Sequence, residues 1–273
     1  MKFFPGCMIH NRYPGVEKAL YYVFETLGIE ITPLEGSSCC PAPSITRSVS
    51  SELWEELGLR NIRLAGGETV MTACNGCFST LLEVSEKYGE GDVRHVAEYL
   101  YTEVGVERIR RYVAKRLPLR VAVHYGCHFF RPSKHKKFVS PERPTMLDEL
   151  VEAIGAESVD YRYKFMCCGG GGGVRAGATE VSHDLLEKKM DAIAEADVDV
   201  IVVVCPLCMN QFDVGQKELK EQRRKDYGIP VVHYVQLLAV AMGMDVEQTG
   251  IDRHNIVSQE LIEKLIMGER AEE

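Results

Sequence analysis

The chain has 273 residues, 45% of them hydrophobic, which is enough for two ordinary domains or one large domain with a buried core. Its formal net charge of −8 and its pI of about 5.6 argue against nucleic acid as the main partner, because phosphate binding needs a basic face. The sequence has no apolar run of roughly 18 residues and no signal-peptide pattern at its start. A cytoplasmic protein without a membrane span is therefore expected.

Strand and helix signals alternate along the first half of the chain. Short β-prone runs predict strands at 2–4, 29–32, 69–73 and 93–95. The spacing of apolar residues predicts helices at 15–27, 51–65, 78–88 and 96–116. This alternation is typical of a parallel sheet that is covered by helices.

The second half shows the same alternation. Strands are predicted at 119–124, 157–161, 199–204 and 230–233. Helices are predicted at 145–155, 175–196, 209–226 and 235–242. Residues 198–204 read VDVIVVV, a nearly continuous apolar run that favours a central parallel strand. Near the C-terminus, 258–266 predicts an amphipathic helix that either packs on the body or docks a partner protein.

The two halves also resemble each other in sequence. The parallel segments are KFFPGC with VAVHYGC, ETVMTACNGC with DVIVVVCPLC, and RHVAEYL with VHYVQLL. A structural repeat of roughly 120 to 130 residues is the simplest interpretation. We therefore predict an α/β fold of two pseudo-symmetric repeats, each a small parallel sheet flanked by helices. The repeats are expected at 1–117 and 118–244, followed by a short C-terminal helical tail at 245–273.

The ten cysteines form two sets of five, and each set reads Cys, then Cys-Cys, then Cys-x-x-Cys. The first set is Cys7, Cys39, Cys40, Cys74 and Cys77, and the second is Cys127, Cys167, Cys168, Cys205 and Cys208. Without export the thiols stay in a reducing compartment, where such patterns bind metal or do redox chemistry more often than they form disulfides. Five thiols are one more than a tetrahedral zinc site or a four-cysteine cluster needs. The sequence therefore predicts two metal centres of the same unusual kind.

Three of the cysteines, Cys7, Cys127 and Cys205, follow directly on the ends of predicted strands. Open parallel sheets bind ligands at the carboxyl ends of their strands. The helix N-termini after these strands favour anionic thiolates and sulfides. We expect one site in each half, and we hypothesise that the two sites face each other across a pseudo-two-fold axis.

Two other kinds of cysteine site remain open from the residues alone. Zinc is one, although adjacent cysteines must splay to reach a single ion and suit a cluster with several irons better. A thioredoxin-like dithiol at Cys74/Cys77 or at Cys205/Cys208 is the other, since both pairs have the Cys-x-x-Cys spacing. Cys-x-x-Cys alone is a weak signal, whereas the whole pattern occurring twice is a strong one.

Six segments carry a resemblance to a known family: PGCMIHNRYPGVE, SSCCPAPS, ACNGC, YGCHFFRPS, CCGGGGG and CPLC. The chain resembles the cysteine-rich CCG-domain proteins, and in particular the B subunits of heterodisulfide reductases from methanogenic archaea. In the segment SSCCPAPS the Cys-Cys pair is followed by proline, whereas the name of the domain, CCG, expects Cys-Cys-Gly. The B subunits look similar at this point, so Pro41 is taken as a family feature.

The resemblance implies that each cysteine set holds a non-cubane [4Fe-4S] cluster, which accounts for the fifth thiol. It implies reduction of the mixed disulfide of coenzyme M and coenzyme B to the two thiols. The chain carries no flavin, nicotinamide or ferredoxin motif, so electrons must arrive from another chain. The implied partners are the ferredoxin-like C subunit and the flavin-bearing A subunit of heterodisulfide reductase, in a larger complex with a hydrogenase or formate dehydrogenase.

Two further functions stay in competition. One is that of a CCG-domain iron–sulfur protein in another oxidoreductase, such as a lactate- or glycolate-oxidising complex or a thiol–fumarate reductase. The other is a zinc-stabilised assembly scaffold without catalysis. Binding of the mixed disulfide separates the first from heterodisulfide reduction, and the identity of the metal decides the second.

Residues other than cysteine are assigned from the chemistry that the family reaction requires. His128 and His10 are the candidate proton donors, because each lies close in sequence to a cysteine and histidine titrates near neutral pH. The implied substrate is anionic, so basic residues near the cysteines are candidates for contact with it. Arg131 and Arg175 are preferred over Arg12.

Three other features near the cysteines have interpretations of their own. Gly169, Gly170 and Gly171 are expected to let the backbone approach a bulky cluster rather than to bind phosphate. The basic run at 134–137 is either a solvated loop or a substrate contact. His183 and the helix around it are interpreted as ordinary surface.

Overall fold

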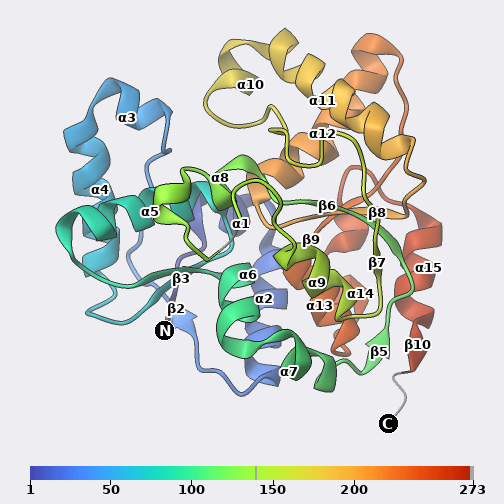
Figure 1. Ribbon diagram of the computed structural model, residues 1–273, viewed down its shortest axis with the longest axis horizontal. Helices are drawn as coiled ribbons and strands as arrows, with labels where there is room; N and C mark the ends of the chain where they lie inside the picture. Colours follow the sequence, from blue (N-terminus) through green and yellow to red (C-terminus); the bar gives the residue numbers. More distant parts are fainter. Residues whose placement is uncertain (139, 271–273) are drawn as a thin grey trace.

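The structure is a computed structural model that describes residues 1–138 and 140–270. It contains two four-stranded parallel sheets with helices packed on their faces (Figure 1). The strand orders are β2-β1-β3-β4 and β7-β6-β8-β9, so in both sheets the second strand of the repeat is at one edge and the first lies beside the third. This shared topology confirms the predicted α/β fold of two similar parallel-sheet units.

The sheets are built from short strands. Those of the first sheet are β1 Lys2–Phe3, β2 Thr32–Pro33, β3 Val70–Thr72 and β4 Val93–His95. Those of the second are β6 Arg120–His124, β7 Glu157–Ser158, β8 Val200–Val203 and β9 Val231–His233. Every residue of the central strands β3 and β8 is buried, as the apolar sequence of each predicts.

Helices connect and cover these strands. In the first half they are α1 Gly6–Arg12, α2 Pro14–Thr26, α3 Ile45–Val49, α4 Ser51–Arg63, α5 Asn75–Tyr88, α6 Val96–Tyr99, the π-helical turn η1 Leu100–Val104 and α7 Val106–Arg111. In the second half they are α8 Cys127–Phe130, the 3-10 turn η2 Ser133–His135, α9 Met146–Glu152, α10 Val174–Gly177, α11 Thr179–Ala194, α12 Pro206–Arg223 and α13 Tyr234–Ala241. The tail adds α14 Val246–Thr249, the 3-10 turn η3 Ile251–Arg253 and α15 Gln259–Met267.

Two predicted helices begin earlier than expected, and the difference matters for the cysteines. The helices predicted at 78–88 and 209–226 begin at Asn75 and Pro206, directly after Cys74 and Cys205. Each of these cysteines is the last residue with extended backbone before its helix. The second cysteine of each Cys-x-x-Cys motif therefore lies in the first helical turn.

The single helix predicted at 96–116 is wrong. Gly105 adopts a positive φ of 82° and ends the π-helical turn, as glycine does at helix C-termini. After the short α7, residues Lys115–Arg116 form strand β5, which pairs antiparallel with β10, Glu269–Arg270. Because this partner strand lies at the far end of the chain, local sequence carries no sign of the pairing.

The C-terminal helix α15 packs on the body of the protein. Leu261 and Leu265 are buried, and Lys264 Nζ donates to Asp199 Oδ1 at 2.6 Å. Ile266 remains 61% exposed. The helix predicted at 258–266 is therefore confirmed. Residues 271–273 of the predicted tail lie outside the described part of the chain.

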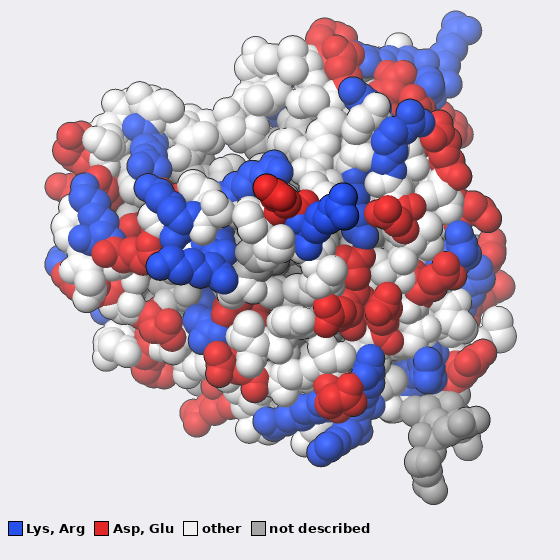
Figure 2. Space-filling view, viewed as in Figure 1, with Lys and Arg blue, Asp and Glu red and all other residues white. Residues whose placement is uncertain are grey.

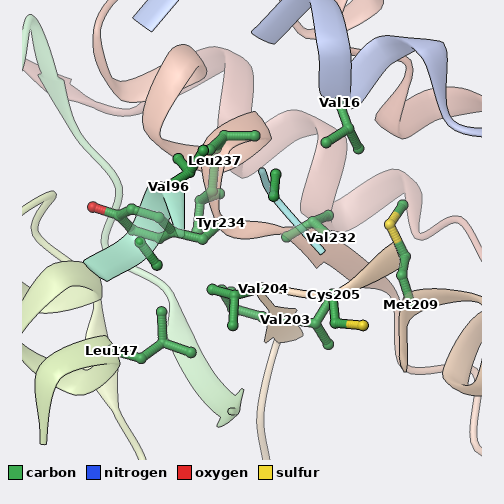
Figure 3. Close-up of a cluster of buried hydrophobic side chains, with 14 of the residues drawn as sticks. Val16, Val96, Leu147, Val203, Val204, Cys205, Met209, Val232, Tyr234 and Leu237 are labelled. Carbon is green, nitrogen blue, oxygen red and sulfur yellow. The ribbon is translucent and has the colours of Figure 1, made fainter. Parts of the chain in front are cut away.

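The two halves share one hydrophobic core. Helix α13 of the second half packs against α2 of the first, and the buried side chains of the two sheets meet in the same cluster (Figure 3). Val16 and Val96 from the first half lie there with Val203, Val232 and Tyr234 from the second. Across residues 1–138 and 140–270, none of the helices combines the length and the apolarity that a membrane span requires.

Two histidines form reciprocal hydrogen bonds between the halves. His95, at the end of β4, places Nε2 at 3.1 Å from the carbonyl oxygen of Val204, while its Nδ1 accepts from the N–H of Ala97. His233, at the end of β9, places Nε2 at 3.0 Å from the carbonyl oxygen of Ala73, and its Nδ1 accepts from Val235. In both rings Nε2 therefore carries the proton and donates it. The two carbonyls immediately precede Cys205 and Cys74.

Burial keeps both of these imidazoles neutral. It lowers the pKa of His95 to about 3, where repulsion by His233 adds to the effect, and it lowers the pKa of His233 to about 4. A proton on Nδ1 of either ring would remove an acceptor and leave a charge in the core. The contact between the halves therefore depends on neutral histidine.

We expect the free energy of unfolding to fall as the pH is lowered from about 7.5 to about 5.5. Both folded pKa values lie below the ordinary value of 6.5, so the unfolded chain binds protons that the folded chain does not. Stability is thus complete above about pH 6.5 and is lost below it, by at most about 1.4 kcal/mol per pH unit for each histidine. Urea unfolding of the anaerobically purified chain at stepped pH measures this change.

A double variant, H95Q with H233Q, serves as the control. Glutamine keeps an N–H donor but does not titrate, so the variant is expected to be less stable at pH 7.5 and to show a shallower dependence on pH. Equal slopes for wild type and variant would show that other groups cause the acid sensitivity.

Candidate functional site

All ten cysteines line one cavity of about 580 Å³ between the two halves. Its wall includes Ser44 and Ile45 at the start of α3 on one side, and Gly172, Gly173, Arg175 and Ala176 at α10 on the other. Figure 2 shows a hollow in the surface between the α3 and α10 regions, with mostly uncharged atoms around it. The two cysteine sets thus meet in a single chamber.

The ten thiols form a continuous series in which each interacts with the next. The order is Cys7, Cys39, Cys40, Cys77, Cys74, Cys205, Cys208, Cys168, Cys167 and Cys127. The series reads the same from either end when the halves are exchanged. Its midpoint is the contact between Cys74 and Cys205, so the hypothesis of two facing sites agrees with the geometry.

The strand ends and helix starts position these thiols. Cys74 and Cys205 follow the ends of β3 and β8, and Cys77 and Cys208 lie in the first turn of α5 and α12. Asn75 donates from Nδ2 to the carbonyl oxygen of Tyr125 at 2.7 Å, which ties the first motif to the strand end before Cys127. The positive ends of α5 and α12 lie at the thiols, and this dipole favours negative sulfur.

Two equivalent glycines allow the thiols to come this close. Gly6 and Gly126 both have a positive φ, of 64° and 73°. A Cβ on Gly6 would lie 2.8 Å from Cys77 Sγ, and one on Gly126 would lie 3.2 Å from Cys208 Sγ. The Gly-Cys pairs seen in both repeats therefore have a steric reason, which sequence reasoning did not identify.

The predicted glycine stretch contributes backbone donors to the second set. The N–H of Gly169 donates to Cys167 Sγ and that of Gly170 donates to Cys168 Sγ, both at 3.4 Å. Gly169 has a φ of 81°, and a Cβ at Gly170 would lie 2.8 Å from Gln211 Cβ. Gly171 lines the cavity itself. The backbone of Gly169 and Gly170 thus lies close to the thiols, and their approach to a cluster stays a prediction.

Crowding disturbs the ionisation of the thiols. A hydrogen bond with Cys167, and then burial, raises the pKa of Cys127 well above its usual range, while hydrogen bonds from Cys127 and Cys168 lower the pKa of Cys167 to about 2. The pKa of Cys168 is raised to about 12, first by its hydrogen bond with Cys167. Thiolates this close repel one another, so they ionise together only when positive charge is placed among them. The donor set therefore fits a cationic metal group.

His128 and Arg175 are the predicted site residues, other than cysteine and glycine, that line the cavity. His128 Nδ1 lies 3.5 Å from Cys127 Sγ, and burial lowers its pKa. Arg175 donates from Nη1 to Gln211 Oε1 at 2.8 Å and from Nη2 to Glu218 Oε1 at 2.6 Å. Two of its five N–H groups are used in this way, and the rest are available to a ligand.

The structure places the other predicted residues away from the thiols. His10 is exposed and lies 3.4 Å from Glu17, and Arg131 is exposed and stacks on the ring of Phe130 at 4.7 Å. Arg12 lines a separate cavity of about 300 Å³. These three side chains follow cysteine motifs in sequence, but the short helices α1 and α8 turn them outward.

Two basic residues that the sequence placed at the surface or in a loop are buried. His183 is fully buried, and its Nε2 lies 3.0 Å from Glu218 Oε2, so it supports the carboxylate that holds Arg175. In the basic run at 134–137, Lys136 is buried and donates to Ser79 Oγ and to the carbonyl oxygen of Arg131. His183 shares a face of α11 with Leu186, Met190 and Ile193, so helical spacing was an available signal for its burial, whereas Lys136 lies in a segment without such a pattern.

His124, at the end of β6, is a further residue of the site that sequence reasoning missed. One of its ring nitrogens and the sulfurs of Cys168 and Cys208 lie within 4.8 Å of one another. Burial keeps its pKa well below the usual value. The available signal was a polar residue that ends the apolar run VAVH before the Gly-Cys pair.

Comparisons with known proteins place the chain in a family. Residues 1–82 and 121–213 match the cysteine-rich domain family called CCG. The B subunit of the ferredoxin:CoB-CoM heterodisulfide reductase of Methanosarcina mazei is 42% identical over 97% of this chain and 96% of that protein. The B subunit of the fumarate reductase (CoM/CoB) of Methanothermobacter marburgensis is 32% identical over 89% of this chain, which matches 46% of that protein.

A solved structure shares the fold. A hypothetical protein from Helicobacter pylori aligns over 95% of this chain and 52% of its own length with a TM-score of 0.68, at 11% sequence identity. This likeness supports the architecture, whereas the sequence matches span both cysteine sets. The chain therefore belongs to the CCG cysteine-rich domain family and, within it, to the group of heterodisulfide reductase B subunits.

Proposed function

We propose that the chain is the catalytic B subunit of a heterodisulfide reductase, reducing the mixed disulfide of coenzyme M and coenzyme B to the two thiols. The observation that carries the proposal is the continuous series of ten thiols in one cavity between the halves. The high identity to a heterodisulfide reductase B subunit over nearly the whole chain supports the same reaction. Activity assays with the mixed disulfide and a reduced electron donor test it directly.

Each five-cysteine set would hold one non-cubane [4Fe-4S] cluster. The first is assigned to Cys7, Cys39, Cys40, Cys74 and Cys77, and the second to Cys127, Cys167, Cys168, Cys205 and Cys208. When bound, these clusters supply the two electrons that cleavage of a disulfide needs. Each set belongs to one cluster-binding repeat, at 1–117 and 118–244, with the helical tail at 245–273. A tetrahedral zinc ion leaves one thiol of each set without a role.

The cavity suits a small anionic disulfide. Its volume of about 580 Å³ is shared between the two proposed clusters and the disulfide, because all ten cysteines line the same cavity. Of the described lining residues, Arg175 is the one that carries a permanent positive charge. Its free N–H groups can donate to a sulfonate, carboxylate or phosphate of the substrate. His128, beside Cys127, is the residue best placed to pass protons to the product thiols.

Electrons have to be delivered by partner proteins. We propose the ferredoxin-like C subunit and the flavin-bearing A subunit of a heterodisulfide reductase, within a larger complex with a hydrogenase or formate dehydrogenase. The relatives are named as B subunits, which supports an assembly of several chains. The ten unpaired thiols suit the reducing cytoplasm, where we place the complex.

Metal analysis of the chain purified without oxygen is expected to find about eight irons and about eight acid-labile sulfides, as two four-iron clusters require. C40A and C168A, one variant in each set, should each retain about half of both. Loss of one thiolate from a set removes a ligand from that cluster and leaves the other cluster intact. Turnover should be abolished in both variants.

The iron, sulfide and zinc content also decides between iron–sulfur clusters and zinc sites. Zinc without sulfide in the folded wild type would overturn the redox proposal. Full activity of either variant after loss of half its iron would show that a single cluster suffices.

Replacing Arg175 by methionine is expected to raise KM for the mixed disulfide by about tenfold to a hundredfold. Removal of a charge-assisted hydrogen bond costs about 1.5–3 kcal/mol of binding free energy. Steady-state kinetics with a reduced dye as electron donor measure the change. R175K, which keeps the charge, should lose less, and R162M is the control because Arg162 pairs with Glu195 on the exposed surface. An unchanged KM in R175M would remove Arg175 from the substrate site.

A further inference from the structure

The two cysteine sets are not equivalent at the strand that precedes each Gly-Cys pair. Aligned on Gly6-Cys7 and Gly126-Cys127, the residue two positions before the glycine is Phe4 in the first half and His124 in the second. Both side chains are buried, with exposures of 0% and 1%. The repeat therefore places an apolar ring in one half where the other half has an imidazole.

His124 lacks a hydrogen-bond partner within the described residues. Neither Nδ1 nor Nε2 has a donor or acceptor within range, although both atoms are buried. Its ring packs edge-on to Phe212, with centroids 5.0 Å apart. A neutral imidazole has one N–H donor and one acceptor, and leaving such groups unpaired in a protein interior costs about 1–3 kcal/mol each. A polar ring retained at this cost points to a ligand that completes its hydrogen bonding.

The nearest candidates for such a bond lie in the second set. A His124 nitrogen, Cys168 Sγ and Cys208 Sγ lie within 4.8 Å of one another, and the two sulfurs are 3.4 Å apart. His124 therefore lies against the sulfurs of the second cysteine set. His95 and His233, which also end strands, have partners in the protein, and His128 stands beside Cys127.

We propose that His124 donates its N–H to a sulfur of the cluster held by the second cysteine set, and that this bond makes the two clusters unequal. The inference rests on the proposed presence of two iron–sulfur clusters. Five thiols already satisfy the second set without the imidazole, so the ring acts as a donor rather than as an iron ligand.

A hydrogen bond to a cluster sulfur stabilises the reduced, more negative state and raises the reduction potential. The second cluster is therefore the more readily reduced of the two, and the first, whose half has Phe4 at the position equivalent to His124, is the less readily reduced. A disulfide held between the halves thus meets two centres that differ in potential, which gives electron transfer across the chamber a direction.

Redox titration of the full chain purified without oxygen tests the proposal in three proteins: wild type, H124F and H124Q. Phenylalanine copies the residue of the first half and removes the donor, whereas glutamine keeps an N–H. We expect two separate midpoint potentials in the wild type. In H124F one potential shifts to a more negative value while the other is unchanged, and H124Q stays close to wild type.

Unchanged potentials in H124F with full iron content would overturn the proposal. Loss of half of the iron in both variants would overturn it as well, because His124 would then be required to hold the cluster. Iron and sulfide analysis of the wild type separates these results from failure of the proposed function, since absence of clusters in the wild type would count against the function itself.

A second measurement needs no variant. Wild-type chain labelled with ¹⁵N-histidine is examined by electron–nuclear double resonance in a paramagnetic cluster state. A weak nitrogen coupling together with an exchangeable proton coupling is expected for an N–H donor. A strong coupling typical of iron-bound nitrogen, or the absence of any histidine coupling, would contradict the proposal.

Discussion

The reciprocal bonds of His95 and His233 are the constraint on which the site depends. Each imidazole reaches from the last strand of one sheet to the carbonyl that precedes the Cys-x-x-Cys motif of the other. These two carbonyls belong to the strand ends that carry Cys74 and Cys205, the thiols at the midpoint of the series. Two small sheets are thereby joined at their functional ends, so that ten thiols share one chamber.

The crowding of the thiols explains why such a joint is needed. Sulfur atoms 3.4–3.9 Å apart resist ionising together because the thiolates repel one another. Helix N-termini and glycine N–H groups stabilise the negative charge, and close backbone approach at Gly6 and Gly126 lets the thiols gather. The same features favour sulfide and thiolate ligands of a metal group. A scaffold that served stability alone would gain nothing from gathering unpaired thiols in one cavity.

Symmetry in the fold and asymmetry in the site serve different purposes. The shared strand order and the mirrored thiol series follow from the repeat, and they give each half a set of five thiols. The charge around the cavity is not symmetric, because Arg175 and the carboxylate of Glu218 that orients it belong to the second half. His124 lies beside the second set, and Phe4 is the equivalent residue of the first half, which adds a difference of the same kind.

The cysteine sets, the α/β alternation and the two-fold repeat could be read from the sequence, because they depend on spacing and on local apolar patterns. Strands such as Val200–Val203 and the helix at Gln259–Met267 were predictable for the same reason. The tertiary structure was needed to show that His10, Arg12 and Arg131 turn away from the thiols, and that His124 and His183 are buried beside the site or its support. The direction and burial of a single side chain depend on neighbours that are distant in sequence, such as Glu218 for His183 and Phe212 for His124, and local sequence does not contain these contacts.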